Sequence, residues 1–543
     1  MRFSELARTY ERMSRAKNDP ERVRLLAAAA RRADAPTLEA LAHFTLGEMT
    51  DPREAGELGV GPGLIRDALA EAAGVDASEV EEEAKRAGDM GEVAGRLARG
   101  RDRLTVVDVW RLANKTVRTG GERAALVREV FGGTTGDGAK YFTRMALNQM
   151  RTGAGLGTLA RALASAFDVD APAVEHLYAM TNDIGLAAAS ARRGPKALAR
   201  AGLSLFHPYQ FMNAQKVESA SEIFSRLAGK DVIFEVKYDG ARLQIHVRAG
   251  SKKEVRLYSR RLNDDTAALP DVVAALACAW RGGDAILEGE AVAYDPTLKK
   301  KQAFQAVLQR LGRKHGVAEK AREIPLVLHL FDMLYHDGED LMGVAQSERR
   351  ARLAALFREG ERVKMTDSVV TSKQPEAEKF FRRAVRAGHE GLMAKDPDAH
   401  YTPGRRTEDW MKLKPAFETL DVVVVGGIWG SGRRRGLLSS LVVAVVDRDA
   451  FKTVGKVGTG FSEQLLRELT ARLEPKIITT RGHDVEIEPE VVIEVDFQDI
   501  QKTERYEAGY VLRIPRFKRL RTDKSVREAD TLARLKRLYA QTH

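Results

Sequence analysis

The sequence predicts a multidomain chain with an all-α domain, an α+β domain and a C-terminal β-barrel. Its 543 residues exceed what one hydrophobic core organises and indicate roughly three domains at about 150 residues each. Up to about residue 205, apolar residues recur three and four positions apart, which is typical of amphipathic helices. Beyond that point, β-branched or alternating runs separated by turn residues predict strands.

The first domain, residues 1–205, is expected to contain about ten short helices, given typical helix lengths. Segments such as ELARTYERMSRA and PTLEALAHFTLGEM carry the helical spacing. Asp19-Pro20 and Ala35-Pro36 place proline at helix starts, where its missing N–H costs nothing. Gly120-Gly121 and Gly132-Gly133 are predicted to end helices.

The second domain, residues 206–418, combines strand-like runs such as DVIFEVKYDG, AILEGEAVAYD and IPLVLHLFDMLYH with helical segments such as AQSERRARLAALFREG. This mixture predicts an α+β domain. The third domain, residues 419–543, contains the short runs DVVVVGGIW, SSLVVAVVD, FKTVGKVG and VLRIPRFKRL at regular spacing. That pattern predicts a small β-barrel of the OB-fold type.

The charge balance of the chain is basic. Lys plus Arg number 88 against 77 Asp plus Glu, a net charge of +11. A basic surface favours phosphate backbones because binding releases condensed counterions, but a solvated surface with no special partner fits the charge equally well. No apolar run approaches the roughly 20 residues of a membrane span, and the first residues are charged and helical in spacing. The protein is therefore expected in the cytoplasm, without a membrane segment.

Cysteine and histidine usage limits the metal chemistry. The single cysteine, Cys278, excludes a disulfide framework and a zinc site of four cysteines. It lies in VVAALACAW and is predicted to be a small buried residue on a helix. His246, His329 and His336 lie on predicted strands without the spacing of metal ligands, so they are interpreted as structural.

The residues Lys237-Tyr238-Asp239-Gly240 follow directly on the predicted strand DVIFEV. A lysine becomes nucleophilic when cationic neighbours or a metal ion favour its neutral amine, because at its ordinary pKa of about 10.4 only about one amine in a few thousand is neutral at pH 7. Arg242 opens the next strand and is placed to face this lysine. Taken alone, the same four residues also fit a hairpin turn with Asp-Gly at its tip.

Five further segments carry charged or aromatic residues in a fixed order. They are LYSRRLNDDT, LEGEAVAYD, LHLFDMLYHDGEDLM, GHEGLMAKDPDAHYTPGRRTEDWMKLKP and LRIPRFKRLRTDKS. Together with EVKYDGARLQ, their order and spacing over residues 235–524 resemble the ATP-dependent DNA ligases, specifically the replicative type found in archaea. The resemblance implies a nucleotidyltransferase (adenylation) domain at residues 206–418, with a helical DNA-binding domain before it and an OB-fold after it.

The resemblance also implies roles for single residues. Lys237 would form a covalent phosphoramidate with AMP, Glu235 would read the adenine amino group, and Phe331 would stack on the base. Glu290 and Glu390 are the implied Mg²⁺ ligands, and Glu290 would also lie near the ribose. The other positions that match the nucleotide-binding motifs are Arg242, Arg260, Lys395, Arg406, Lys412, Lys414, Arg521 and Lys524.

By the same resemblance, the chain uses ATP and Mg²⁺ to seal nicks in duplex DNA during replication, repair and recombination, as a nucleoid-associated monomer. The basic turn WGSGRRRGLLSS, residues 429–440, resembles a DNA-contacting loop of the family. At Glu288 the family more often has Asp, which leaves the role of that residue open. Archaeal relatives often bind a sliding clamp through a short Gln-then-aromatic segment, and the helical domain contains no convincing copy of it.

Three alternative functions fit part of the same pattern. An NAD-dependent ligase shares the lysine motif but carries a four-cysteine zinc finger, which one cysteine cannot supply. An RNA ligase or a capping guanylyltransferase shares the lysine chemistry, and the helical extension of about 200 residues favours duplex DNA instead. A nucleic-acid scaffold without catalysis would not require the complete set of motifs.

Overall fold

The computed structural model describes residues 1–51, 58–115, 119–200, 202–295, 300–302, 304–415, 419–430, 434 and 436–542. The chain divides into two compact units. One consists of Met1–Ala77 and Ala94–Pro415, and the other of Ser78–Val93 and Ala416–His543. None of the helices in the described ranges combines the length and apolar character needed to cross a bilayer.

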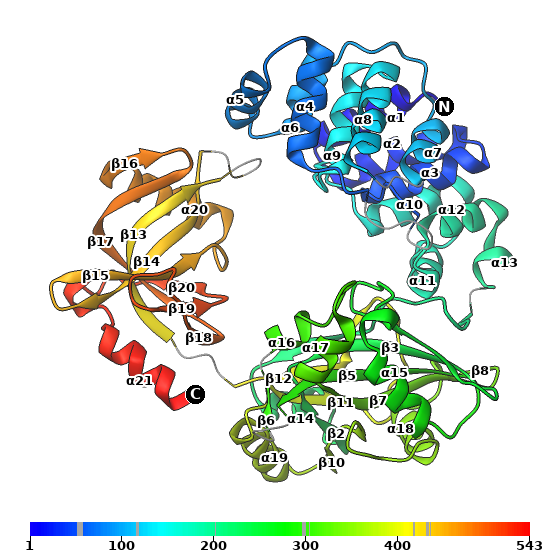
Figure 1. Ribbon diagram of the computed structural model, residues 1–543, viewed down its shortest axis with the longest axis vertical. Helices are drawn as coiled ribbons and strands as arrows, with labels where there is room; N and C mark the ends of the chain where they lie inside the picture. The colour runs from blue at the N-terminus through cyan, green and yellow to red at the C-terminus, as the bar shows by residue number, and fades with distance from the viewer. Residues whose placement is uncertain are drawn as a thin grey trace. The chain divides into compact units, whose positions relative to one another are not determined.

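The N-terminal part is all-α, as predicted: its described residues form thirteen helices joined by loops before the first strand, where about ten were expected (blue to teal in Figure 1). Asn18 and Asp34 accept hydrogen bonds from backbone N–H groups in the first turns of α2 and α3, and both helices carry proline there. The helices are α1 (Phe3–Arg15), α2 (Asp19–Arg32), α3 (Ala35–Leu46), α4 (Pro62–Ala73), α5 (Ala77–Ala87), α6 (Met90–Leu97), α7 (Val106–Asn114), α8 (Gly120–Gly133), α9 (Gly136–Ala146), α10 (Leu156–Phe167), α11 (Ala171–Thr181), α12 (Ile184–Arg193) and α13 (Pro195–Leu198).

One of the two predicted glycine stops is wrong. Gly132-Gly133 ends α8 as predicted, but Gly120-Gly121 begins that helix. The reason is a reciprocal cap: the Thr119 hydroxyl accepts from the Glu122 backbone N–H at 3.2 Å, and the Glu122 carboxylate accepts from the Thr119 N–H at 2.9 Å. Two satisfied backbone donors stabilise a helix start more than two glycines oppose it.

The α+β region contains two sheets, the first with strand order β1-β12-β11-β2-β10. Val232, Phe234 and Val236 of β2 lie in an apolar core with residues of two helices, α14 and α19. Because successive side chains of a strand point to opposite faces, Glu235 and Lys237 lie on the other face. The elements are β1 (Asn213–Val217), α14 (Ala220–Arg226), β2 (Val232–Lys237), β10 (Ser368–Thr371), α19 (Gln374–Arg386), β11 (Gly391–Lys395) and β12 (Arg406–Leu413).

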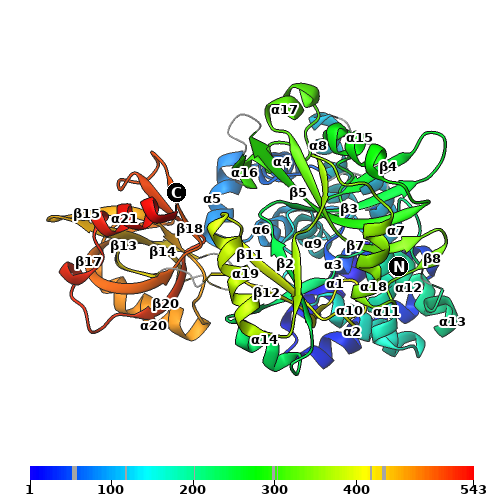
Figure 2. The ribbon, with the colours of Figure 1, turned by 90° about the horizontal axis from the view of Figure 1, so that it is seen from below.

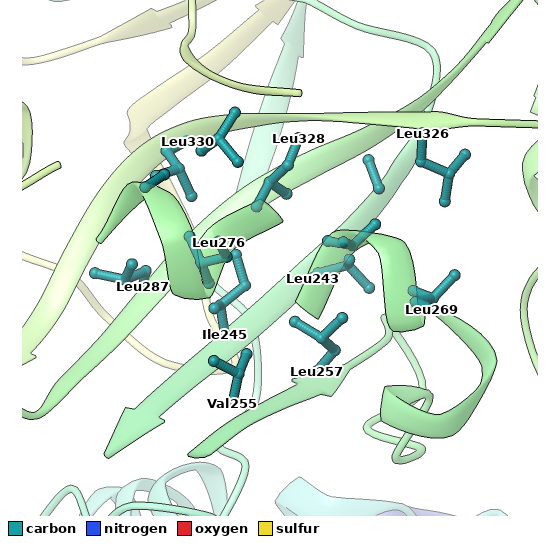
Figure 3. Packing of buried hydrophobic residues seen from close by; sticks show 14 of the residues in the cluster. Leu243, Ile245, Val255, Leu257, Leu269, Leu276, Leu287, Leu326, Leu328 and Leu330 are labelled. Atoms are coloured by element: carbon teal, nitrogen blue, oxygen red, sulfur yellow. The ribbon is translucent and has the colours of Figure 1, made fainter. Parts of the chain in front are cut away.

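The second sheet has the order β4-β3-β5-β7-β8, with β6 paired to β5 and β9 paired to β7. Leu243, Leu257 and Leu328 of this sheet pack with Leu276 of α15 (Figure 3), each contributing about 1.5–3 kcal/mol by burial. The elements are β3 (Ala241–Arg248), β4 (Glu254–Tyr258), α15 (Pro270–Ala279), β5 (Ala285–Asp295), β6 (Lys300–Lys301), α16 (Phe304–Leu308), α17 (Val317–Glu323), β7 (Leu326–His336), β8 (Glu339–Asp340), α18 (Gln346–Ala355) and β9 (Val363–Met365).

Cys278 lies on α15 as predicted, but it is exposed rather than buried. The buried stripe of this helix runs through Val272, Leu276 and Ala279, which recur at spacings of four and three residues. Cys278 lies next to that stripe, on the side facing solvent.

The C-terminal region is a β-barrel, as predicted. Its main sheet follows the order β15-β14-β13-β17, and β17 pairs with both β16 and β20. The backbone N–H of Phe517 in β20 donates to the carbonyl of Thr459, just beyond β15, at 2.9 Å, which joins the two ends of the path. The elements are β13 (Thr419–Trp429), β14 (Leu438–Asp447), β15 (Ala450–Val457), α20 (Glu463–Leu473), β16 (Ile477–Arg481), β17 (Asp484–Asp496), β18 (Asp499–Lys502), β19 (Tyr510–Arg513), β20 (Arg516–Leu520) and α21 (Leu532–Thr542).

The last helix, α21, packs beside β14 and β18 (red in Figure 2). Leu535 of this helix is fully buried in the core of the barrel, and Leu532 and Leu538 pack around it. The three leucines lie three residues apart on one face of the helix, so the helix covers apolar surface of the barrel.

Arg349 on α18 is buried and holds that helix against β7. Its guanidinium donates to both carboxylate oxygens of Asp332, at 2.8 and 3.0 Å, and to the carbonyl of Ala399 at 3.1 Å. Both partners of this ion pair are fully buried. Removing one partner therefore leaves an uncompensated buried charge.

We expect Arg349→Met to lower the free energy of unfolding by about 3 kcal/mol or more, since it leaves Asp332 buried and unpaired. Urea unfolding followed by circular dichroism measures this loss. Arg352→Met on the same helix is the matched control, because Arg352 pairs with the exposed carboxylates of Glu339 and Glu348, so its loss should change stability little. Equal effects of the two substitutions would contradict the proposed role of Arg349.

Candidate active site

The polar face of the five-stranded sheet brings the sequence-predicted residues together. Lys237 of β2 is paired with Gly391 of β11, and Glu235 is paired with Met393. Met393 is in turn paired with Lys412 of β12. Since side chains directly opposite each other in an antiparallel pair point to the same face, Lys237, Glu235 and Lys412 share one surface.

Glu390, immediately before β11, binds two lysines at once. Its Oε2 forms an ion pair with the Lys237 ammonium, and its Oε1 accepts a hydrogen bond from the ammonium of Lys414. The backbone N–H of Glu390 also donates to the Lys237 carbonyl at 3.0 Å. Burial raises the pKa of Glu390, but the two ammonium groups outweigh burial and bring the pKa below its ordinary value. The carboxylate therefore stays charged between the lysines.

Gly391 permits this close arrangement of strands. Its φ of +139° is rarely adopted by residues with a side chain, and a Cβ at this position would collide with the Leu413 carbonyl of β12. The glycine thus lets β12, with Lys412 and Lys414 at its end, approach the strand pair that carries Lys237.

Lys412 lies within a cluster of positive charge. Burial is the largest cause of its lowered pKa, and the nearby charges of Lys414, Lys237, Arg406 and Arg260 lower the pKa further. All five cations were predicted to contact the nucleotide. Like charges repel, so a group with several negative charges, such as a chain of phosphates, would stabilise this cluster.

Glu290 of β5 faces the same region and is paired with Arg242 in the sheet. Burial raises its pKa to about 7; Lys237 and Arg242 oppose this rise, while Glu390 and Asp239 add to it. Within the described ranges, no three His, Cys, Asp or Glu side chains come together as a metal-binding group. Two carboxylates still fit Mg²⁺, which takes one or two carboxylates together with phosphate oxygens and water.

Arg242 is anchored by the buried carboxylate of Glu288, at 2.5 Å. The same carboxylate accepts hydrogen bonds from the hydroxyls of Tyr209 and Tyr401, at 2.9 and 2.6 Å. Burial lowers the pKa of Arg242, but the charge and hydrogen bond of Glu288, together with the nearby tyrosines Tyr401 and Tyr209, outweigh burial and hold the pKa above its ordinary value. Glu288, whose role the sequence left open, thus fixes the arginine. The two tyrosines were not predicted because they lie 79 and 113 residues from Glu288.

Phe331 of β7 lies beside the other end of the polar face. The Lys395 ammonium is 4.6 Å from the Phe331 ring centroid and 4.3 Å from that of Trp410, and it pairs with Glu235 at 2.8 Å. Burial lowers the pKa of Lys395, and the charge of Glu235 opposes this shift. Glu235 also binds Arg350 of α18, a site residue that no sequence motif indicated.

The three histidines were predicted to be structural. His246 is buried and its Nδ1 accepts from the Phe206 backbone N–H at 2.9 Å; burial lowers its pKa to about 3. His329 stacks on Tyr238, next to Lys237, with ring centroids 3.8 Å apart, and burial lowers its pKa to about 4. Both rings are neutral at pH 7, and His329 supports the turn that follows Lys237.

Arg521 and Lys524 belong to the other compact unit. Asp421 of β13 accepts hydrogen bonds from Arg521 at 2.7 and 2.8 Å and from Lys524 at 2.6 Å. Asp523 binds the other side of the Arg521 guanidinium at 2.8 and 2.9 Å. In the predicted DNA-contacting turn, residues 431–433 and 435 lie outside the described residues.

Comparison with known proteins agrees with this arrangement. Residues 211–414 match a family model described as ATP dependent DNA ligase domain, residues 434–524 match ATP dependent DNA ligase C terminal region, and residues 2–164 match DNA ligase N terminus. The DNA ligase of Thermococcus fumicolans is 40% identical over 554 residues, covering 99% of this chain and 98% of that protein. The chain belongs to the ATP-dependent DNA ligases.

Other archaeal ligases show the same extent of similarity. The DNA ligase of Methanopyrus kandleri is 39% identical, covering 100% of this chain and 99% of its own, and that of Archaeoglobus fulgidus is 39% identical, covering 99% and 98%. The solved structure named Pmar-Lig_PreS3 has a TM-score of 0.60 at 18% identity, covering 95% of this ligase and 99% of that chain. The predicted family and fold class are thus confirmed.

The raised pKa of Glu290 predicts a pH-dependent stability. Between about pH 4.5 and 7 the folded state binds more protons at this carboxyl than the unfolded state does, so stability falls as pH rises through this range. Glu290→Gln removes that dependence. We expect the free energy of unfolding of the parent, relative to Glu290→Gln, to decrease from pH 5 to pH 8. Urea titrations at unit pH steps measure it, and a constant difference would contradict the assignment.

Proposed function

We propose that this ligase seals nicks in duplex DNA through a covalent AMP on Lys237. The observation that carries the proposal is the ammonium of Lys237 at the end of a central strand, paired with Glu390 and surrounded by the cluster that includes Arg260, Arg406 and Lys412. A nucleophilic lysine needs such cationic surroundings, and a polyphosphate needs the same charges.

The reaction runs in three nucleotidyl-transfer steps, each a displacement at a phosphorus atom. The neutral amine of Lys237 attacks the α-phosphorus of ATP; a P–N bond forms, the bond to pyrophosphate breaks, and the amine proton passes to solvent. The 5′-phosphate of the nick then attacks the AMP phosphorus, and Lys237 leaves and regains a proton. Finally the 3′-hydroxyl attacks the 5′-phosphorus, loses its proton to solvent, and AMP leaves. Each transfer depends on positioning and charge neutralisation.

The cationic cluster supplies most of that neutralisation. Lys412, Lys414 and Arg406 would bind the phosphoryl oxygens that carry negative charge during each transfer. Glu290 and Glu390 would hold Mg²⁺, which supplies further neutralisation of phosphate charge when it is bound. In the resting state Lys237 and Lys414 bind the carboxylate of Glu390. When ATP binds, its phosphates would replace this carboxylate as the anionic partner of the two lysines.

The adenosine would be oriented by residues of both sheets. Phe331 offers an aromatic face for the purine, Glu235 an acceptor for its amino group, and Glu290 a partner for the ribose. Arg242, held by Glu288, would contact the ribose and phosphate side. Arg521 and Lys524 would stabilise the departing pyrophosphate, and Asp421 would hold both cations in place until then.

We propose a division into a helical DNA-binding domain (residues 1–205), an adenylation domain (206–418) and an OB-fold domain (419–543). DNA is the partner, in replication and repair. The ligase is proposed to act as a monomer in the cytoplasm, at the nucleoid. The helical domain carries no convincing copy of the Gln-then-aromatic segment with which relatives bind a sliding clamp.

The test uses ATP labelled in the α-phosphate, followed by a chase with nicked DNA. The parent should acquire one covalent AMP and pass it to the nick. Lys237→Ala should acquire none yet still bind nicked DNA, whereas Lys230→Ala, which removes an exposed lysine just before the same strand, should behave like the parent. Covalent AMP on the Lys237→Ala protein would refute the assignment. Preference for nicked RNA over nicked DNA would favour the RNA-ligase alternative.

A further inference from the structure

Two consecutive arginines on α18 have different surroundings. Arg349 is fully buried and ties the helix to Asp332 of β7. Arg350, one residue on, reaches the five-stranded sheet and binds Glu235 of β2. Because Arg349 fixes the helix, the start of the Arg350 side chain has a fixed position relative to both sheets.

Arg350 makes three contacts with its planar guanidinium. One Nη donates to Oε1 of Glu235, and the other donates to the Thr366 carbonyl at 2.7 Å and to the Ser368 hydroxyl at 3.0 Å. Ser368 is the direct partner of Glu235 in the β10–β2 pair. Thr366 is itself bound to the carbonyl of Leu330, the residue before Phe331. A single guanidinium thus connects the Glu235 carboxylate to the strand that carries Phe331.

The Glu235 carboxylate is almost completely buried, with 2% of its side chain exposed, and within the described part of the chain each of its oxygens has one cationic partner. Arg350 holds Oε1, and Lys395 holds Oε2 at 2.8 Å. A carboxylate has about four acceptor sites, so these two contacts leave acceptor capacity unused. The Lys395 ammonium also lies over the Phe331 ring, so a base stacked on Phe331 would have its edge near this carboxylate.

We propose that Arg350 is a positioning residue that fixes the orientation of the Glu235 carboxylate and thereby makes the site selective for a purine with an amino group at position 6. This inference rests on the proposed function and names a residue that determines which nucleotide is used. Arg350 contacts neither phosphate nor base in this scheme; it acts through Glu235.

The selectivity follows from the chemistry of a fixed carboxylate. An ionised carboxylate only accepts hydrogen bonds, so it binds the amino group of adenine, repels the 6-carbonyl oxygen of guanine, and gains nothing from an unsubstituted purine. If the carboxylate rotated, the donors of Lys395 would become available to a carbonyl oxygen. Without Arg350, Oε1 of Glu235 loses the one cationic partner it has among the described residues, and Lys395 on Oε2 remains.

The experiment compares ATP with purine riboside triphosphate, which lacks the 6-amino group, and with GTP. The rate of covalent nucleotide transfer to the intact protein is followed by mass spectrometry in single turnovers over a range of nucleotide concentrations. The parent should prefer ATP over purine riboside triphosphate by about 10-fold or more, the usual effect of one hydrogen bond to a charged group. Arg350→Met should lose most of this preference, mainly through weaker ATP binding, and should discriminate less against GTP.

Two further variants separate positioning from a structural role. Glu235→Gln should lose the same preference, and the double variant Glu235→Gln with Arg350→Met should lose no more, because both residues act on one contact. Arg350→Lys keeps the charge but cannot make the forked set of contacts, so it should show an intermediate preference. Arg352→Met, at a half-buried position on the same helix whose guanidinium pairs with the exposed Glu348, should leave the preference unchanged.

Each outcome decides the question. If Arg350→Met slows transfer from ATP and from purine riboside triphosphate equally, Arg350 is only structural and the inference is wrong. If Arg350→Met does not fold, an Arg350→Lys protein with the full preference of the parent would also overturn it. If the parent forms no covalent nucleotide at all, the proposed function itself fails, and this inference with it.

Discussion

The Glu390 carboxylate between the ammonium groups of Lys237 and Lys414 is the interaction on which the rest of the active site depends. Lys412, Arg406 and Arg260 add three more positive charges nearby, and the carboxylates of Glu390, Glu290 and Asp239 lie among them. Of these, Glu390 is ionised and bound to Lys237, whereas Glu290 has a pKa of about 7 and is only partly ionised at neutral pH. The resting site therefore carries excess positive charge that phosphates can neutralise.

The backbone of the five-stranded sheet makes this charge arrangement possible. Phe234 and Val236 lie in the apolar core on one face of β2. Because side chains alternate along a strand, Glu235 and Lys237 point to the opposite face. Gly391 allows β12 to approach closely, and the pairing of β11 with β2 and β12 sets the spacing between Lys237 and Lys412. The packing of the apolar face thus determines where the charges of the polar face lie.

The sequence predicted the parts of this site that depend on local pattern. The apolar run DVIFEV predicted a strand with Lys237 at its end, and β2 is found there. Local pattern could not distinguish Arg349 from Arg350, because the difference depends on Asp332 and Glu235, which lie 17 and 115 residues away in the chain. The start of α8 was missed for a related reason: glycine is a weak signal, and the capping pair around it decided the outcome.

The most direct test of this account measures the reactivity of Lys237 in the parent and in Glu390→Gln. Acetylation of each lysine is followed by peptide mass spectrometry as a function of pH, with exposed Lys230 as the internal reference. Loss of the carboxylate leaves the Lys237 ammonium among like charges, which favours the neutral, reactive amine. The account predicts that the pH of half-maximal Lys237 reactivity moves downward in Glu390→Gln, while that of Lys230 stays unchanged. An unchanged or higher midpoint for Lys237 would contradict the account. If the substitution only made Lys237 more accessible to the reagent, the maximal rate of acetylation would rise but the midpoint would not move.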